Sequence, residues 1–200
     1  MINATDSKGT FYILNKKDRT PIIFIHGVGL DHSIWDPQIN EFDNTVLIYD
    51  ILGHGKTPLN KNDLSFDDFS DQIINLIDEL KFNKVHLVGF SIGSLIARNF
   101  ATRFNDRLAS LTLLCSIFNR SDKEQKIVND RFEQTKKDHK LTKDALKRWF
   151  TEDFLNKNPG ISDKIFNILQ NNNMNNFIKI YSLFVKHQDN EKFENIKTKT

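Results

Sequence analysis

The chain of 200 residues has one cysteine and no long apolar stretch. Cys115 has no partner for a disulfide within the chain, and we expect it to pack as a small apolar side chain in a buried strand. No apolar run approaches the roughly 18 residues of a membrane-spanning helix, and the polar segment after Met1 is unlike a secretion signal. We therefore expect a cytoplasmic protein that contacts no membrane.

The chain also lacks a strong excess of charge of either sign. Its 28 Lys and Arg residues are nearly balanced by 26 Asp and Glu residues, for a formal net charge of +2. Binding to nucleic acid requires a concentrated positive charge, so we expect no nucleic-acid partner. The chain is 38% apolar and 27% charged, which is typical of a globular protein with one sizeable core.

Short apolar runs alternate with amphipathic segments over the first 118 residues. Four runs indicate strands buried on both faces, and a fifth, at residues 10–14, indicates an antiparallel strand. The four buried runs lie at residues 21–25, 46–50, 84–88 and 108–115. Helical spacing predicts helices over residues 65–81 and directly after position 91. Because the connections are too long for hairpins, we predict an α/β fold: a mostly parallel sheet with helices on both faces.

The composition changes near residue 119, where apolar residues become fewer and Lys, Asp and Asn become more frequent. Apolar residues then recur at helical spacing, without strand-like runs. We predict an incomplete α/β core at residues 1–118, a helical cap at 119–192 and the start of a return to the core at 193–200. We expect the cap to cover the carboxyl ends of the strands, where ligands bind in such sheets.

The segment Gly89-Phe90-Ser91-Ile92-Gly93 follows one apolar run and precedes an amphipathic helix. A Gly-x-Ser-x-Gly sequence between a strand and a helix raises a serine nucleophile on a sharp turn. The two glycines allow the backbone of both arms to pass close to the serine. Ser91 is therefore our candidate catalytic nucleophile. The alternative is a serine in an ordinary strand-to-helix turn.

A glycine-rich turn at residues 26–29 ends the second predicted strand. The backbone N–H groups of Val28 and Ile92 are our candidates for the two donors of an oxyanion hole. Gly27 and Trp35 are candidates for the lining of a substrate pocket, although Trp35 fits a packing role equally well. The alternative for the turn is a simple reversal of the chain.

Three segments together resemble the α/β-hydrolase fold family in their order and spacing. They are Phe24-Ile25-His26-Gly27-Val28-Gly29, Tyr49-Asp50 with Gly53-His54-Gly55, and the segment around Ser91. Within that family the chain is similar to 3-oxoadipate enol-lactonases and related carboxylic-ester hydrolases. Arg148-Trp149-Phe150-Thr151, and Tyr181 with Asp189 ahead of Ile196, carry this narrower resemblance.

The resemblance implies a serine esterase or lactonase that forms an acyl-enzyme on Ser91. Its substrate would be a small-molecule ester or lactone similar to 3-oxoadipate enol-lactone. Arg148 and Trp149 would line the substrate pocket, and we expect neither a cofactor nor a metal ion.

The resemblance also implies a catalytic acid and then a histidine after the serine. Only His139 and His187 follow Ser91, and both fall in predicted cap helices, where an imidazole rarely reaches the nucleophile. Asp122 is a weak candidate for the acid, and we interpret His26 as a residue that stabilises its own turn. We therefore expect these 200 residues to form the amino-terminal two thirds of a serine hydrolase that is nearly inactive by itself.

Two alternatives from other classes remain open. The chain would be a small-molecule-binding protein that keeps the fold without catalysis, or a carbon–carbon bond hydrolase or acyltransferase on the same fold. Turnover of an enol-lactone, a simple ester or a vinylogous diketone would distinguish them.

Overall fold

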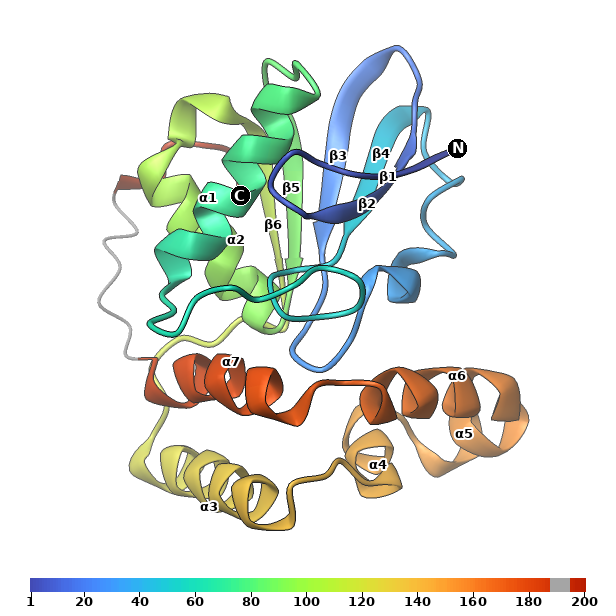
Figure 1. The fold of residues 1–200 in the computed structure, drawn as a ribbon, viewed down its shortest axis with the longest axis vertical. Coiled ribbons are helices and arrows are strands. Elements are labelled where there is room, and N and C mark those ends of the chain that lie inside the picture. The colour runs from blue at the N-terminus through green and yellow to red at the C-terminus, as the bar shows by residue number, and fades with distance from the viewer. Residues whose placement is uncertain (188–194) are drawn as a thin grey trace.

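The computed structural model describes residues 1–187 and 195–200. Its centre is one sheet of six strands in the order β1-β2-β4-β3-β5-β6 (Figure 1). The strands are β1 (Ile2–Thr5), β2 (Phe11–Asn15), β3 (Arg19–Ile25), β4 (Asn44–Tyr49), β5 (Val85–Phe90) and β6 (Leu108–Leu114). The four strands β4, β3, β5 and β6 run parallel, and β1 and β2 pair antiparallel at one edge. The predicted α/β class is confirmed.

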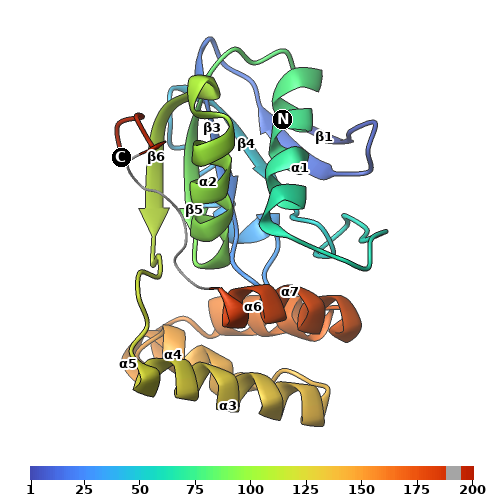
Figure 2. The same ribbon diagram turned by 90° about the vertical axis from the view of Figure 1, so that its left-hand side faces the viewer.

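The central strands are buried on both faces because successive side chains point to opposite sides of a sheet. On β3, Ile23 and Ile25 pack into the main core with the helices α1 (Phe66–Glu79) and α2 (Ile92–Arg103). The alternate residues Ile22 and Phe24 pack on the other face, against Trp35 at the end of the 3-10 helix η1 (His32–Trp35). Figure 2 shows α1 and α2 side by side over one face of the sheet.

Helix α1 begins where the sequence predicts it. The side chain of Ser65 caps the helix, and the carboxylate of Asp68 accepts a hydrogen bond from the backbone N–H of Ser65 at 2.7 Å. This reciprocal capping box satisfies donors that the first helical turn leaves free. Past α1, Lys81 takes a positive φ of 58° as the chain turns into β5.

A second group of helices lies beyond the carboxyl ends of the parallel strands (Figures 1 and 2). These helices are α3 (Asp122–Asp138), η3 (Lys143–Ala145), α4 (Leu146–Trp149), α5 (Glu152–Lys157), α6 (Pro159–Gln170) and α7 (Met174–Lys186). We call this group the helical layer. Phe132 of α3 packs with Phe177, Tyr181 and Val185 of α7 in a small core of its own. No helix in the part of the chain that the structure describes is long and apolar enough to span a membrane.

The structure differs from the sequence-based expectations at two points. Strand β1 occupies Ile2–Thr5, a segment whose polar residues gave no strand signal. Cys115 is exposed and lies after β6, at a φ of 52°, because the strand ends at Leu114 and the chain turns away from the sheet. Helix α6 begins at Pro159, since the fixed φ of proline suits the first helical position.

Asp189 and the predicted boundary at residues 192–193 lie outside the described residues. The segment that follows approaches the free edge of β6, where the backbone N–H of Leu111 donates to the carbonyl oxygen of Lys199 at 2.9 Å. Ile196 packs against the main core.

Candidate active site

Ser91 occupies a strained turn at the carboxyl end of β5. Its φ of 56° and ψ of −120° lie outside the regions that non-glycine residues ordinarily populate. Its backbone N–H donates to the carbonyl oxygen of Leu114 at 3.0 Å, and its own carbonyl oxygen accepts from the Ser94 hydroxyl at 2.6 Å. Contacts on both sides therefore hold Ser91 in this conformation, and α2 begins at the next residue.

Close backbone packing around Ser91 explains the flanking glycines. A Cβ atom at Gly89 would lie 2.2 Å from the carbonyl oxygen of Gly93. A Cβ atom at Gly93 would lie 2.6 Å from the carbonyl oxygen of Ile25, at the end of β3. Backbone atoms cannot move away as a flexible side chain would, so both positions require glycine. The predicted steric role of the two glycines is confirmed.

A cavity of about 170 Å³ lies between this turn and the helical layer. The structure brings the predicted residues Gly27, Val28, Ser91, Arg148 and Trp149 together in its lining. Further lining side chains are Leu30, Phe90, Arg131, Thr135, Leu141, Ala145, Leu169, Phe177, Tyr181 and Phe184. The predicted donor residue Ile92 is fully buried directly behind Ser91, as the first residue of α2.

The turn at residues 26–29 touches the candidate nucleophile. A Cβ atom built at Gly27 would lie 3.4 Å from the Cβ of Ser91, and 3.2 Å from the ring of Phe90. Val28 is half-buried and lines the cavity. The backbone of this turn at Gly27 therefore passes close to the side chain of Ser91.

Two arginines bring positive charge into the cavity, and no carboxylate is among its described lining residues. Burial lowers the pKa of Arg148, and the nearby charge of Arg131 lowers it further. Burial raises the pKa of Tyr181, although Arg131 and Arg148 act in the opposite direction. All three groups come from the helical layer and line the same cavity. Sequence reasoning identified Arg148 but missed Arg131, which the periodicity of α3 does not distinguish from a solvent-exposed charge.

Trp35 does not line this cavity, contrary to the predicted pocket role. Its ring packs against the ring of Phe24, with the two ring centroids 4.8 Å apart, and only 8% of the surface of Trp35 is exposed. Strand β3 directs Phe24 to the face of the sheet that η1 covers, so Trp35 belongs to the core on that side.

The remaining candidate residues lie away from Ser91. His139 ends α3 in the left-handed conformation and is exposed. His187 follows α7, with its ring 5.4 Å from the ring of Phe66. Asp122 is the exposed first residue of α3. His187 and Asp122 line a larger cavity of about 530 Å³ that does not include Ser91, so size alone does not identify the site.

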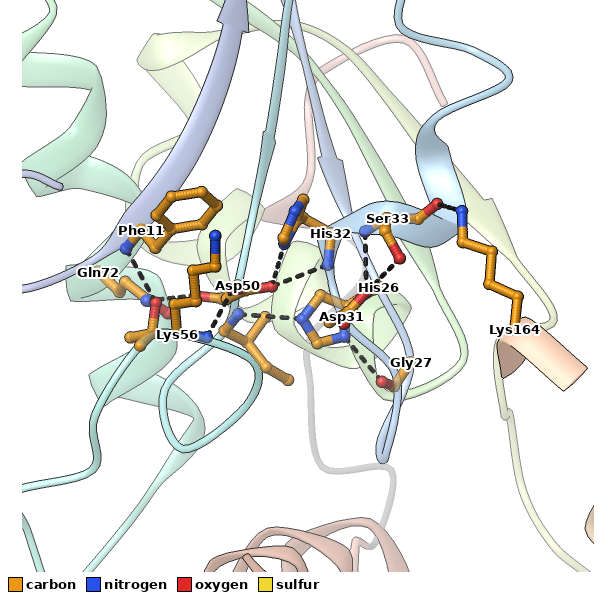
Figure 3. Close-up of polar contacts among 12 residues, drawn as sticks. Phe11, His26, Gly27, Asp31, His32, Ser33, Asp50, Lys56, Gln72 and Lys164 are labelled. Atoms are coloured by element: carbon orange, nitrogen blue, oxygen red, sulfur yellow. Dashed lines mark hydrogen bonds and ion pairs between the residues drawn. The ribbon is translucent and has the colours of Figure 1, made fainter. Parts of the chain in front are cut away.

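A buried carboxylate to which the sequence analysis assigned no chemical role organises the turn after β4 (Figure 3). Asp50 accepts from the backbone N–H and the Nδ1 of His32 at 2.8 and 2.7 Å, and from the backbone N–H of Lys56 at 2.8 Å. Burial acts to raise the pKa of Asp50, but the hydrogen bond from His32 and the other donors outweigh it and lower that pKa. Conversely, burial acts to lower the pKa of His32, and Asp50 raises it overall. Asp50 therefore joins His32 to the backbone at Lys56, and the two pKa shifts favour the charged forms of both side chains.

Comparison with known proteins agrees with this geometry. Residues 20–185 match the model of the alpha/beta hydrolase fold family. Over 179 residues the chain is 29% identical to (E)-2-((N-methylformamido)methylene)succinate hydrolase of Acinetobacter baylyi, a match that covers 88% of this chain and 67% of that protein. It is 24% identical over 166 residues to 3-oxoadipate enol-lactonase 2 of the same species, covering 82% of this chain and 62% of the relative.

Solved structures show the same fold. The enol-lactonase from Burkholderia xenovorans LB400 superposes with a TM-score of 0.82 at 22% identity, over 98% of this chain and 78% of that one. The esterase from Exiguobacterium antarcticum superposes with a TM-score of 0.78 at 17% identity, over 98% of this chain and 77% of that chain. The chain spans between 62% and 78% of the length of these four proteins. The parallel sheet, the strained serine turn and the family match together show that this chain belongs to the alpha/beta hydrolase fold family.

Proposed function

We propose that this chain carries the nucleophile and the oxyanion hole of a serine hydrolase that acts on a carboxylic ester or lactone. The observation that carries the proposal is the strained turn of Ser91, which lines the cavity together with the glycine-rich turn at residues 26–29. In the reaction, the Ser91 hydroxyl attacks the carbonyl carbon and loses its proton to a base. The C–O bond to the leaving group then breaks as the base returns that proton to the departing oxygen, and water, deprotonated by the same base, hydrolyses the acyl-enzyme and frees Ser91.

Two backbone donors would stabilise the oxyanion that forms in each step. Ile92 begins α2, so its N–H has no partner within the helix, and the helix N-terminus favours negative charge. Val28 lies in the turn that approaches the Ser91 side chain. Donors that are already oriented need no rearrangement as charge develops, which is the main source of their catalytic effect.

Proton transfer in this reaction would fall to a histidine outside the described lining of the cavity. Among the described residues no histidine lines the cavity beside Ser91, and His139 and His187 lie elsewhere. We infer that the helical layer acts as a cap, because its side chains enclose the space above Ser91 and limit the access of water.

The charge of the cavity supports a substrate that bears a carboxylate. Arg131 and Arg148 both line it, and a guanidinium group binds a carboxylate through paired hydrogen bonds. The names of two relatives refer to a substituted succinate and to an enol-lactone of 3-oxoadipate, which are dicarboxylic compounds or their derivatives. A lactone or ester with a free carboxylate is therefore the preferred substrate class.

A fluorophosphonate probe tests the nucleophile and its backbone donors: the serine oxygen bonds to phosphorus, fluoride leaves, and the donors stabilise the phosphonyl oxygen, which sustains a slow reaction even where no histidine takes the proton. We expect mass spectrometry to find slow modification of Ser91 in the chain and none at that peptide in Ser91→Ala. Ser116→Ala is the matched control, since Ser116 is exposed and lies outside the cavity around Ser91. A probe that leaves Ser91 unmodified, or that modifies Ser91→Ala equally, refutes the proposal.

A further inference from the structure

Two buried histidines connect the turn after β3 with the turn after β4. His54 lies in the second turn, and its Nε2 accepts the backbone N–H of Gly29, in the first turn, at 2.9 Å. Its Nδ1 contacts the carbonyl oxygen of Leu52, in its own turn, at 3.3 Å. The side chain is fully enclosed, with 2% of the residue exposed.

His26 makes the reciprocal pair of contacts. Its Nε2 accepts the backbone N–H of Ile51, in the second turn, at 3.1 Å. Its Nδ1 contacts the carbonyl oxygen of Gly27, in its own turn, at 2.8 Å (Figure 3). The two rings meet edge to face, with centroids 5.3 Å apart. Each imidazole therefore bonds its own turn through Nδ1 and the opposite turn through Nε2.

These contacts determine the protonation state of both rings. A backbone N–H can only donate, so each Nε2 must be an unprotonated acceptor, and each Nδ1 must carry the hydrogen that it donates to a carbonyl oxygen. Both histidines are therefore neutral. Burial agrees with this assignment, since it lowers the pKa of His26 and lowers that of His54 to about 3.

The two rings together hold both peptide groups that flank Val28. In a trans peptide the C=O and N–H point in opposite directions, so the bond from His26 to the Gly27 carbonyl also orients the N–H of Val28. The bond to His54 holds the next peptide through the N–H of Gly29. Asn172, in the loop between α6 and α7, donates from Nδ2 to the carbonyl oxygen of Gly29 at 2.8 Å. The sequence assigned no role to this loop.

Gly29 leaves no room for the turn to relax. Its φ is +78°, and a Cβ atom there would lie 2.9 Å from a ring carbon of Phe177 in the helical layer. The turn is thus held from the sheet side by the two histidines and from the opposite side by α7.

We propose that His54 is a positioning residue that, in a reciprocal brace with His26, orients the Val28 N–H toward the oxyanion. The inference rests on the proposed function, because Val28 is a donor only if Ser91 reacts with a carbonyl or phosphonyl group. His54 itself touches no reacting atom.

Three variants test the brace in the chain as it stands. His54→Leu removes the acceptor, and His54→Gln keeps an oxygen acceptor on a side chain of similar reach. His86→Leu is the control, since His86 is a half-buried histidine on β5 that bonds the hydroxyl of Ser110, away from the turn. The readouts are amide hydrogen exchange at Gly29 and the rate at which a fluorophosphonate modifies Ser91.

We expect His54→Leu to lose the protection of the Gly29 amide and to slow the modification of Ser91 by up to about 10²-fold, the lower range for loss of one oxyanion donor. His54→Gln should restore most of both signals, and His86→Leu should match the unmodified chain. If His54→Leu exchanges the Gly29 amide at the wild-type rate and is labelled at Ser91 at the wild-type rate, the inference is overturned.

Two further outcomes are also decisive. If the wild-type chain is not labelled at Ser91, the proposed function fails, whereas Gly29 exchange still decides whether His54 holds the turn. If His54→Leu does not fold, the ¹⁵N spectrum of the wild-type imidazoles decides. An Nδ1–H tautomer at both His26 and His54 supports the brace, and an Nε2–H tautomer at His54 overturns it.

Discussion

The buried imidazole of His54 makes the stability of the fold depend on pH, and its surroundings set the size of the effect. Burial lowers the pKa of His54 to about 3, whereas an exposed histidine in the unfolded chain titrates near 6.5. As the pH falls below 6.5, the unfolded state takes up a proton that the folded state rejects. The contribution of the neutral His54 ring to the free energy of unfolding is therefore complete above about pH 6.5 and is lost progressively as the pH falls toward 3.

The free energy of unfolding should fall by about 1.4 kcal/mol for each pH unit within that interval. Between pH 7 and about pH 4.5, His54 alone then accounts for a loss of about 2.5 kcal/mol, a substantial part of the roughly 5–15 kcal/mol that stabilises an ordinary domain. Burial lowers the pKa of His26 as well, so His26 acts in the same direction. The raised pKa of His32 acts in the opposite direction only above pH 6.5, since its pair with Asp50 gains stability as the pH falls toward 6.5 and keeps that stability at lower pH.

Urea unfolding of the wild-type chain and of His54→Gln, each at pH 7 and about pH 4.5, isolates the effect. His26, His32 and Asp50 are common to both proteins, so the difference between the two pH dependences reports His54. We expect the wild type to lose about 2.5 kcal/mol more than the variant over this interval. His86→Gln retains both buried imidazoles and should follow the wild type. Equal losses in the wild type and His54→Gln would refute the reasoning.

Two further predictions concern packing. Gly89→Ala should lower the free energy of unfolding in urea by about 3 kcal/mol or more, because the added Cβ would lie 2.2 Å from the carbonyl oxygen of Gly93. The control Gly160→Ala should be neutral or stabilising, because its Cβ would meet nothing within 4 Å. Similar losses of stability in both variants would contradict the steric argument. Phe132→Ala should cost about 3–5 kcal/mol, because it empties the core between α3 and α7, whereas the exposed control Lys123→Ala should stay within about 0.5 kcal/mol. A small effect of Phe132→Ala would show that the helical layer does not depend on this contact.

Rules that act over a few residues determined much of the fold from the sequence. The alternation of apolar runs and amphipathic segments indicated the parallel sheet, and helical spacing from residue 65 indicated the start of α1. The glycines on either side of Ser91 indicated the strained turn, because only that spacing lets two backbone arms meet. Such signals are readable because their physical cause lies within one or two elements.

Contacts between elements distant in the chain were decided only by the tertiary structure. Nothing near Trp35 in the sequence shows which face of the sheet it covers, because that depends on the register of β3 and on where η1 packs. Arg131 enters the cavity because α3 packs on α7, and not because of its own neighbours. The reciprocal bonds of His26 and His54 require β3 and β4 to be adjacent and parallel, so that their turns meet at one edge. The sequence by itself therefore determined which residue was raised on the turn, while the order and register of the strands decided what surrounds it.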